Sequence, residues 1–301
     1  MKQVGLSIGE LQGRFGDKRA LEIAVESGFD AVDFGLGRFG KGAFPIYADG
    51  DEAVLEYFSE IGEYARHLGL TISQTHGRTR IASPDPAFCQ EMEWVTRMDL
   101  LATHALGVKY CVVHSVNSFC FPDEDAEFMH ARNLQFFEKM IPYAEQYGVY
   151  MTQETFGDTR PRGIRRMDFF GDSRQLRKTY DRLNTTYKAL CVDTGHTNKA
   201  VGMAQILGTP VPGVADTIRL FGKDLKVLHL NDNNSFTDQH LPPRCKMEGG
   251  VNWQEVYEAL DEIGYDGVYN FELSLGHYGE AIEEAVHFLG TYLRRSVEGR
   301  L

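Results

Sequence analysis

Six residues that can bind a metal ion stand at the ends of short apolar runs along the chain: His76, His114, Glu154, Asp193, His229 and Glu272. Imidazole nitrogens and carboxylate oxygens are donor atoms that divalent ions accept in proteins. Each residue alone has an ordinary structural explanation, as a buried histidine bonded to the backbone or as an acidic cap of the next helix. Their recurrence after successive apolar runs predicts a shared metal centre.

The densest group of such residues lies in the run VLHLNDNNSFTDQH, between residues 227 and 240. An apolar run there ends at His229, a polar segment follows, and Asp238 and His240 come two residues apart. Asp and Asn are common in loops because they suit turns, which is the ordinary reading of any single position. Imidazole and carboxylate groups directly after an apolar run indicate a metal site instead.

The apolar runs predict eight strands, at residues 4–8, 31–34, 70–75, 109–113, 149–153, 189–192, 225–228 and 268–271. Apolar residues at helical spacing predict helices at 18–27, 52–68, 86–106, 126–147, 176–183, 212–221, 253–263 and 281–293. Glycines such as Gly69, Gly107 and Gly148 end several of these helices. Eight alternating strands and helices predict an α/β fold, a (β/α)8 TIM barrel, with residues 1–301 as a single domain.

In such a barrel the carboxyl ends of the strands form the catalytic face. We therefore expect Glu154, Asp193, His229 and Glu272, from the last four strands, to bind one divalent ion, which could be Mn, Co, Mg or Zn. Glu154 and Glu272 are also the expected catalytic pair. A metal that held a sugar carbonyl and the neighbouring hydroxyl would acidify the adjacent C–H and stabilise an enediolate, so that one glutamate removes the proton and the other returns it.

Composition and charge restrict the class of protein. Apolar residues make up 43% and charged residues 25% of the 301 residues, as in ordinary globular proteins. No apolar run approaches the roughly 18 residues that a membrane span needs, and the start of the chain has no signal-peptide pattern. The five cysteines are scattered without a paired motif, which favours reduced thiols in the cytoplasm. The formal charge of −12 argues against nucleic acid as a partner.

Several segments resemble the xylose-isomerase-like superfamily, and specifically its sugar-phosphate isomerase/epimerase group. They are Glu154, the segment from Asp193 to His196, the segment from His229 to Asp232, the segment from Asp238 to Pro243, Trp253 and Glu272. The resemblance implies a sugar or sugar phosphate substrate, metal binding by Glu154, Asp193, His229 and Glu272, and a substrate hydroxyl held by His196. His76, His114, Asp238 and His240 are the further residues expected to contact substrate. The resemblance also implies a homo-oligomer, since barrels of this group are often dimers or tetramers.

Two other activities remain open on the same residues. The superfamily includes the endonuclease-IV type of abasic-site endonuclease, and its three-zinc ligand positions are all filled here, with His196, Asp238 and His240 as the third set. The Ser-Val-Asn that follows His114 and the Leu-Pro-Pro that follows His240 depart from the endonuclease pattern. A dehydratase acting on a polyol or keto-sugar would use the same site if a β-hydroxyl group could leave.

Cationic and aromatic residues near the strand ends are further candidates for substrate contacts. Arg160, Arg162, Arg165 and Arg166 cluster after the fifth strand, and Arg78 and Arg80 follow His76. Either group could bind a phosphate or carboxylate, or lie in solvated surface loops. Phe34 and Phe156 could line a sugar pocket or belong to the core.

Overall fold

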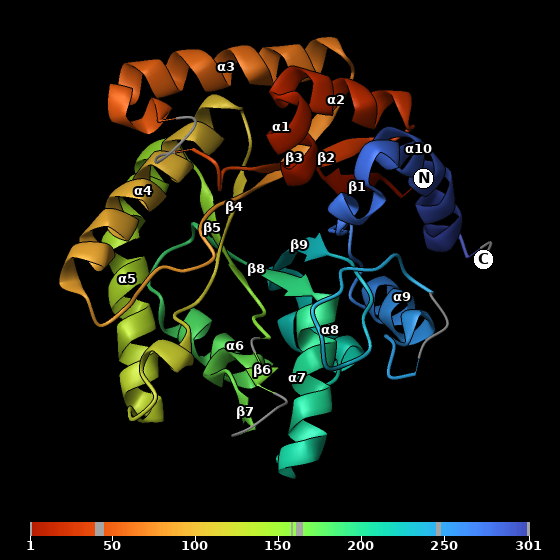
Figure 1. The fold of residues 1–301 in the computed structure, drawn as a ribbon. Helices are drawn as coiled ribbons and strands as arrows, with labels where there is room; N and C mark the ends of the chain where they lie inside the picture. Colours follow the sequence, from red (N-terminus) through yellow and green to blue (C-terminus); the bar gives the residue numbers. More distant parts are fainter. Residues whose placement is uncertain (1, 40–44, 158, 161–164, 245–247, 300–301) are drawn as a thin grey trace.

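Eight parallel strands form the centre of the protein (Figure 1). The computed structural model describes residues 2–39, 45–157, 159–160, 165–244 and 248–299. The strands pair in the order β10-β1-β2-β3-β4-β5-β8-β9. They are β1 (Val4–Ser7), β2 (Ala31–Gly35), β3 (Thr71–His76), β4 (Tyr110–Val113), β5 (Tyr150–Glu154), β8 (Lys188–Asp193), β9 (Leu225–His229) and β10 (Tyr269–Phe271). A parallel bridge between Leu230, just after β9, and Phe271 of β10 closes the barrel.

The helices surround the strands, as Figure 1 shows. They are α1 (Gly9–Phe15), α2 (Asp17–Glu26), α3 (Asp51–His67), α4 (Pro86–Ala105), α5 (Ala126–Tyr147), α6 (Ser173–Arg182), α7 (Thr194–Leu207), α8 (Val214–Phe221), α9 (Trp253–Glu262) and α10 (Ile282–Val297). Among the described residues, no helix is long and apolar enough to cross a bilayer. The fold is the predicted (β/α)8 TIM barrel, and all eight predicted strands are present.

Helix α5 illustrates how the sequence sets an element of the outer layer. The Asp125 carboxylate accepts a hydrogen bond from the Phe128 backbone N–H and so caps the first turn. Gly148 ends the helix with a φ of 66°, a left-handed conformation that glycine adopts without steric cost. Between these ends, Phe137, Met140 and Ala144 are buried. Burial of this apolar face is the main source of the helix's stability.

The barrel interior is packed with side chains, as it is in other barrels of this size. Val112 of β4, Cys191 of β8 and Val227 of β9 form one buried apolar cluster, and each is at most 1% exposed. The helices pack on the outside through a second and much larger cluster. The polar residues at the carboxyl ends of the strands therefore stand above an apolar floor.

Two helices and two short strands were not predicted from the sequence. They are α1, α7 and the antiparallel strands β6 (Thr159–Arg160) and β7 (Arg166–Met167), and the two strands lie where only an arginine-rich loop was expected. Helix α7 contains two glycines, Gly195 and Gly202, which disfavour helix. Its buried surface extends around much of the helix, so no clear apolar stripe marks it in the sequence.

Candidate active site

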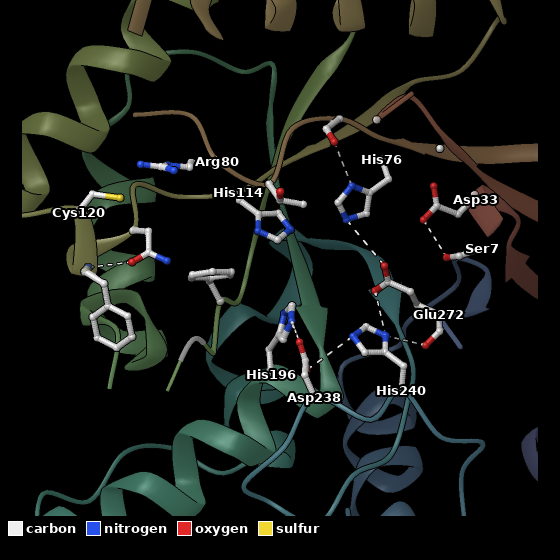
Figure 2. Close-up of a pocket in the computed structure, with 18 residues that line it drawn as sticks. Ser7, Asp33, His76, Arg80, His114, Cys120, His196, Asp238, His240 and Glu272 are labelled. Atoms are coloured by element: carbon white, nitrogen blue, oxygen red, sulfur yellow. Dashed lines mark hydrogen bonds and ion pairs between the residues drawn. The ribbon is translucent and has the colours of Figure 1, made fainter. Parts of the chain in front are cut away.

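The six predicted residues all lie at the carboxyl ends of barrel strands. His76, Glu154, Asp193 and His229 are the last residues of β3, β5, β8 and β9, while His114 and Glu272 come directly after β4 and β10. Parallel strands in a closed barrel bring these positions to one face. Figure 2 shows side chains from several of these strands turned toward one another around a common cavity.

Glu154 is the centre of this arrangement and is completely buried. Its Oε2 atom lies 2.9 Å from His114 Nε2 and 3.6 Å from His76 Nε2. Its Oε1 atom lies 3.2 Å from His196 Nδ1 and 3.3 Å from His229 Nδ1. One carboxylate therefore faces four imidazole rings, and such a concentration of donor atoms needs either bound protons or a cation between them.

The geometry of these close approaches fits a divalent ion. Both carboxylate oxygens of Glu154, Nδ1 of His229 and Oε2 of Glu272 are buried without a partner in hydrogen-bond geometry. Buried polar atoms are normally satisfied, so unsatisfied donor and acceptor atoms that converge on one place require a reason. Ligand atoms of His76, Glu154, His229 and Glu272 all lie within 4.8 Å of one another. Mixed imidazole and carboxylate donors at this spacing suit Mn, Co, Mg or Zn.

Asp193 lies beside this group and has local partners of its own. Its Oδ1 atom accepts a hydrogen bond from the His196 backbone N–H (2.6 Å) and so caps α7, and its Oδ2 atom accepts one from Asn231 Nδ2 (2.8 Å). Asp193 falls within ligand distance of Glu154 and His196, and separately of His240 and Glu272. Of the four ligands expected from the sequence, three therefore group together, with His76 in fourth place where Asp193 was expected.

A second cluster lies beside the first and contains His196, Asp238 and His240. The Oδ2 atom of Asp238 is 3.5 Å from His196 Nε2, and its Oδ1 atom is 3.6 Å from His240 Nε2. The Lys199 ammonium, which the sequence did not single out, lies 3.0 Å from the same Oδ1 atom. His240 has a φ of 46°, an uncommon conformation for a histidine, and its ring nitrogen Nδ1 is held 3.0 Å from the Glu272 carbonyl.

The mutual charges shift the pKa values of the site. Burial lowers the pKa of His76, but Glu154 and Glu272 outweigh burial and raise it to about 9. Burial likewise lowers the pKa of His240, and Asp238 and Glu272 raise it to about 9. Burial raises the pKa of Asp193 to about 6. Such shifts are typical of functional sites, and histidines held protonated would release protons when a metal binds.

Asp33 is a site residue that sequence reasoning missed. Its Oδ2 atom lies 3.1 Å from His229 Nε2 and accepts a hydrogen bond from the Ser7 hydroxyl (3.0 Å), and its Oδ1 atom is buried without a partner. Asp33 stands within β2 and not at its end, so the rule that located the other residues passed over it. The available signal was a carboxylate inside an apolar run, because an aspartate in a buried strand is rare unless it has a partner.

Asp232 and Trp253 have a structural role despite their place in the family resemblance. The Trp253 indole N–H donates to Asp232 Oδ2 (2.7 Å), and the Val251 backbone N–H donates to Asp232 Oδ1 (2.9 Å). Asp232 also exchanges two backbone hydrogen bonds with Leu241. These contacts fix the long loop after β9, so that Asp238 and His240 project over the site.

A cavity of about 750 Å³ opens above the two clusters. His76, His114, Phe156, Asp238 and Glu272 are among the residues that line it, and Arg80 stands in its wall (Figure 2). A volume of this size is within the range of small-molecule sites.

Most of the described arginine and phenylalanine residues that the sequence suggested as substrate contacts lie away from the cavity. Arg78 is paired with Asp99 (3.2 Å) and so belongs to the scaffold. Phe34 is fully buried in the core and does not line the cavity. Arg166 stacks on Phe119, and Arg165 is exposed. Arg162 and the side chain of Arg160 lie outside the described residues.

Three solved structures share this fold over nearly the whole chain. The IOLI protein with a bound zinc atom aligns with a TM-score of 0.74 at 16% identity, covering 100% of this chain and 99% of that one. A D-tagatose 3-epimerase-like protein aligns at 0.70 and 18%, with the same coverage. A D-psicose 3-epimerase with D-tagatose, from Clostridium cellulolyticum H10, aligns at 0.70 and 17%, covering 99% of each chain. At these identities the likeness establishes the fold.

Sequence comparison adds one partial relative and one family. The uncharacterized protein MJ1311 of Methanocaldococcus jannaschii is 30% identical over 146 residues, which are 46% of this chain and 42% of that protein. The family of the xylose isomerase-like TIM barrel matches residues 21–292, which confirms the resemblance seen in the sequence. The chain therefore belongs to the xylose isomerase-like TIM barrel family.

Proposed function

We propose that this protein is a divalent-metal-dependent epimerase or isomerase of a sugar or sugar phosphate. One observation carries the proposal: Glu154 and Glu272 hold buried carboxylate oxygens that have no partner in hydrogen-bond geometry, beside a cavity of about 750 Å³. Two such carboxylates suit the removal and return of a proton on carbon. The epimerase names of two structural neighbours support a sugar as the substrate class.

The two glutamates have different surroundings, which suits a division of labour. Glu272 lines the cavity and its side chain is 22% exposed, whereas the Glu154 side chain is fully buried behind the histidines. They also come from strands that are not adjacent, β5 and β10. One glutamate would take the proton from the carbon beside the carbonyl and leave an enediolate. The other would protonate that carbon from the opposite face, and the configuration would invert.

The proposed ligands of the ion are Glu154, Asp193, His229 and Glu272. Their fit rests on the unsatisfied buried atoms of Glu154, His229 and Glu272. A bound divalent ion supplies a Lewis acid that polarises a carbonyl group. His76 competes with Asp193 for the fourth position, because it lies within ligand distance of the other three.

The other polar residues of the cavity would orient the substrate. His114, His196 and His240 present imidazole groups toward it and suit hydrogen bonds to sugar hydroxyls. Arg80 stands in the cavity wall, with Phe88 stacked against its guanidinium and no carboxylate beside it among the described residues. A phosphate or carboxylate at the far end of a substrate would pair with this cation. Arg80 would therefore decide whether a phosphorylated sugar binds more tightly than the free sugar.

Conversion of ketoses tests the proposal. The protein would be incubated with a panel of ketopentoses, ketohexoses and their phosphates, with Mn²⁺ or Co²⁺ and with chelator, and the sugars would be separated by chromatography. We expect one ketose to convert to its epimer or aldose isomer only when metal is present. A product lighter than its substrate by one water would show that the protein is a dehydratase. In a separate assay, cleavage of abasic DNA would show that it is an endonuclease.

A further inference from the structure

The cluster of His196, Asp238 and His240 has the composition of a second metal site. Two imidazoles and one carboxylate lie within 4.8 Å of one another, and a zinc ion commonly accepts this donor set. The cluster adjoins the first one through His196, whose Nδ1 atom is 3.2 Å from Glu154. Composition alone would therefore predict a centre with more than one ion.

A cation of the protein already occupies this cluster. The Lys199 Nζ atom lies 3.0 Å from Asp238 Oδ1, the same oxygen that approaches His240. The Lys199 side chain is only 8% exposed, although that of Asp238 is 42% exposed. Lys199 follows His196 by one turn of α7, so the start of this helix places the imidazole and the ammonium together. An ammonium so nearly buried is rare unless a carboxylate pairs with it.

We propose that the Lys199 ammonium keeps a second metal ion out of this cluster and thereby leaves His196 and His240 free to bind substrate hydroxyls. A divalent ion bound there would share Asp238 with a positive charge a few ångströms away, and the repulsion in a half-buried site would weaken its binding. Lys199 is thus a positioning residue, because it acts through Asp238. The inference rests on the proposed function only in naming the ligand as a substrate hydroxyl.

The number of ions per chain tests this role. Lys199→Met removes the charge and keeps much of the length of the side chain, and Lys199→Arg is the matched control that keeps the charge. Each protein would be dialysed to equilibrium against micromolar Zn²⁺ and its metal content measured by elemental mass spectrometry. We expect Lys199→Met to hold one ion more than the wild type, and Lys199→Arg to hold the same number. The added ion should disappear in the double variant Lys199→Met, Asp238→Asn.

A second comparison keeps the proposal testable if Lys199→Met does not fold. Asp238→Asn in the wild-type background removes the anchor of the cluster, and we expect it to leave the metal count unchanged. Loss of an ion in that variant would overturn the proposal, because the cluster would then hold metal despite Lys199. An unchanged count in folded Lys199→Met would overturn it equally.

The two proposals fail differently in this experiment. The absolute count of the wild type tests the metal centre of the proposed function, and a wild type without any bound ion would contradict that centre. The difference between Lys199→Met and the wild type tests the role of Lys199, whatever the absolute count. Substrate binding gives a separate readout: Lys199→Met should raise KM at least 10-fold, because an added ion would engage the two imidazoles.

Discussion

At the residue scale, the proposed proton transfer depends on the carboxylates of Glu154 and Glu272. Glu154→Gln and Glu272→Gln keep the size of each side chain but lose the base. We expect each variant to lower kcat roughly 10²–10⁴-fold or more, the usual contribution of a positioned acid or base. Steady-state turnover of the substrate found in the ketose panel measures this. Turnover within 10-fold of wild type in either variant, with metal bound, would contradict the two-carboxylate mechanism.

Asp33 acts at the same scale through His229. Its carboxylate lies 3.1 Å from His229 Nε2, which directs Nδ1 of the same ring toward Glu154 and Glu272. A carboxylate behind a metal-binding histidine fixes the ring and raises its basicity. We expect Asp33→Asn to weaken metal binding by roughly 10–100-fold, measured by competition with a chelator. Ser7→Ala, which removes only the hydroxyl bonded to Asp33, is the control and should have a much smaller effect.

A further prediction concerns which residue is the fourth ligand of the proposed ion, Asp193 or His76. Asparagine caps helices about as well as aspartate, so Asp193→Asn keeps the start of α7 while it removes the charge and the hydrogen bond that Oδ2 accepts from Asn231. We expect Asp193→Asn to reduce metal affinity more than His76→Ala does, as a metal ligand should. Titration of both metal-free variants with Co²⁺, followed by absorbance, compares them. A larger loss in His76→Ala would assign the fourth position to His76.

The positions of these residues explain how much of the site could be predicted from the sequence. His76, Glu154, Asp193 and His229 end apolar runs, so the prediction of the strands also predicted that these four residues lie on one face of the barrel. Asp33 lies within its run, and Lys199 lies on a helix that the sequence did not predict. The sequence also could not decide whether Asp193 or His76 lies closer to the other three proposed ligands. That choice depends on the direction of side chains, which is set by tertiary packing.

Helix α7 is the element on which the site depends most. Asp193 precedes it, and His196 and Lys199 lie in its first two turns. The helix lies so close to the loop after β9 that a Cβ atom on Gly195 would be 1.9 Å from Asn231 Oδ1. This approach explains why a glycine, unfavourable in a helix, stands there. It also explains why helical propensity failed to predict α7, since packing against a distant segment overrides propensity.

Gly195→Ala should therefore destabilise the protein. The added methyl group must displace Asn231, which donates a hydrogen bond to Asp193. We expect a loss of about 1–3 kcal/mol in the free energy of unfolding, together with weaker metal binding. Gly13→Ala in α1 is the control, since a Cβ there meets nothing within 4 Å. Denaturant unfolding compares the two, and equal stabilities would contradict the close approach.

At the scale of the whole molecule, the proposed metal binding would be coupled to folding. The eight strands bring residues from across the chain to one face, from Asp33 on β2 to Glu272 after β10. Only the closed barrel assembles the complete set of ligands, so a metal that binds the folded state stabilises it. The alternation of apolar strand-like runs with helical patterns, together with the glycines that end the helices, was enough to predict this architecture. The barrel repeats this one local pattern eight times. The short antiparallel strands β6 and β7 repeat no such pattern, and the sequence predicted only a loop there.

Removal of the metal should lower the melting temperature. At a free metal concentration 100-fold above Kd, binding contributes about 2.7 kcal/mol. We expect chelator to remove this contribution and metal to restore it, as measured by calorimetry. The triple variant Glu154→Gln, His229→Gln, Glu272→Gln should show no response to either addition. A melting temperature of the wild type that is indifferent to metal and chelator would contradict the coupling.

Incorporation of solvent deuterium tests the central claim most directly. The protein, loaded with metal, would be incubated in D₂O with the panel of ketoses and ketose phosphates, and each sugar would be analysed by mass spectrometry at early conversion. Two glutamates on opposite sides of the carbon predict a product that carries one deuterium on carbon, while unreacted substrate stays unlabelled. A product that forms without deuterium, or that has lost a water, would contradict the proposed epimerase or isomerase with two carboxylate bases.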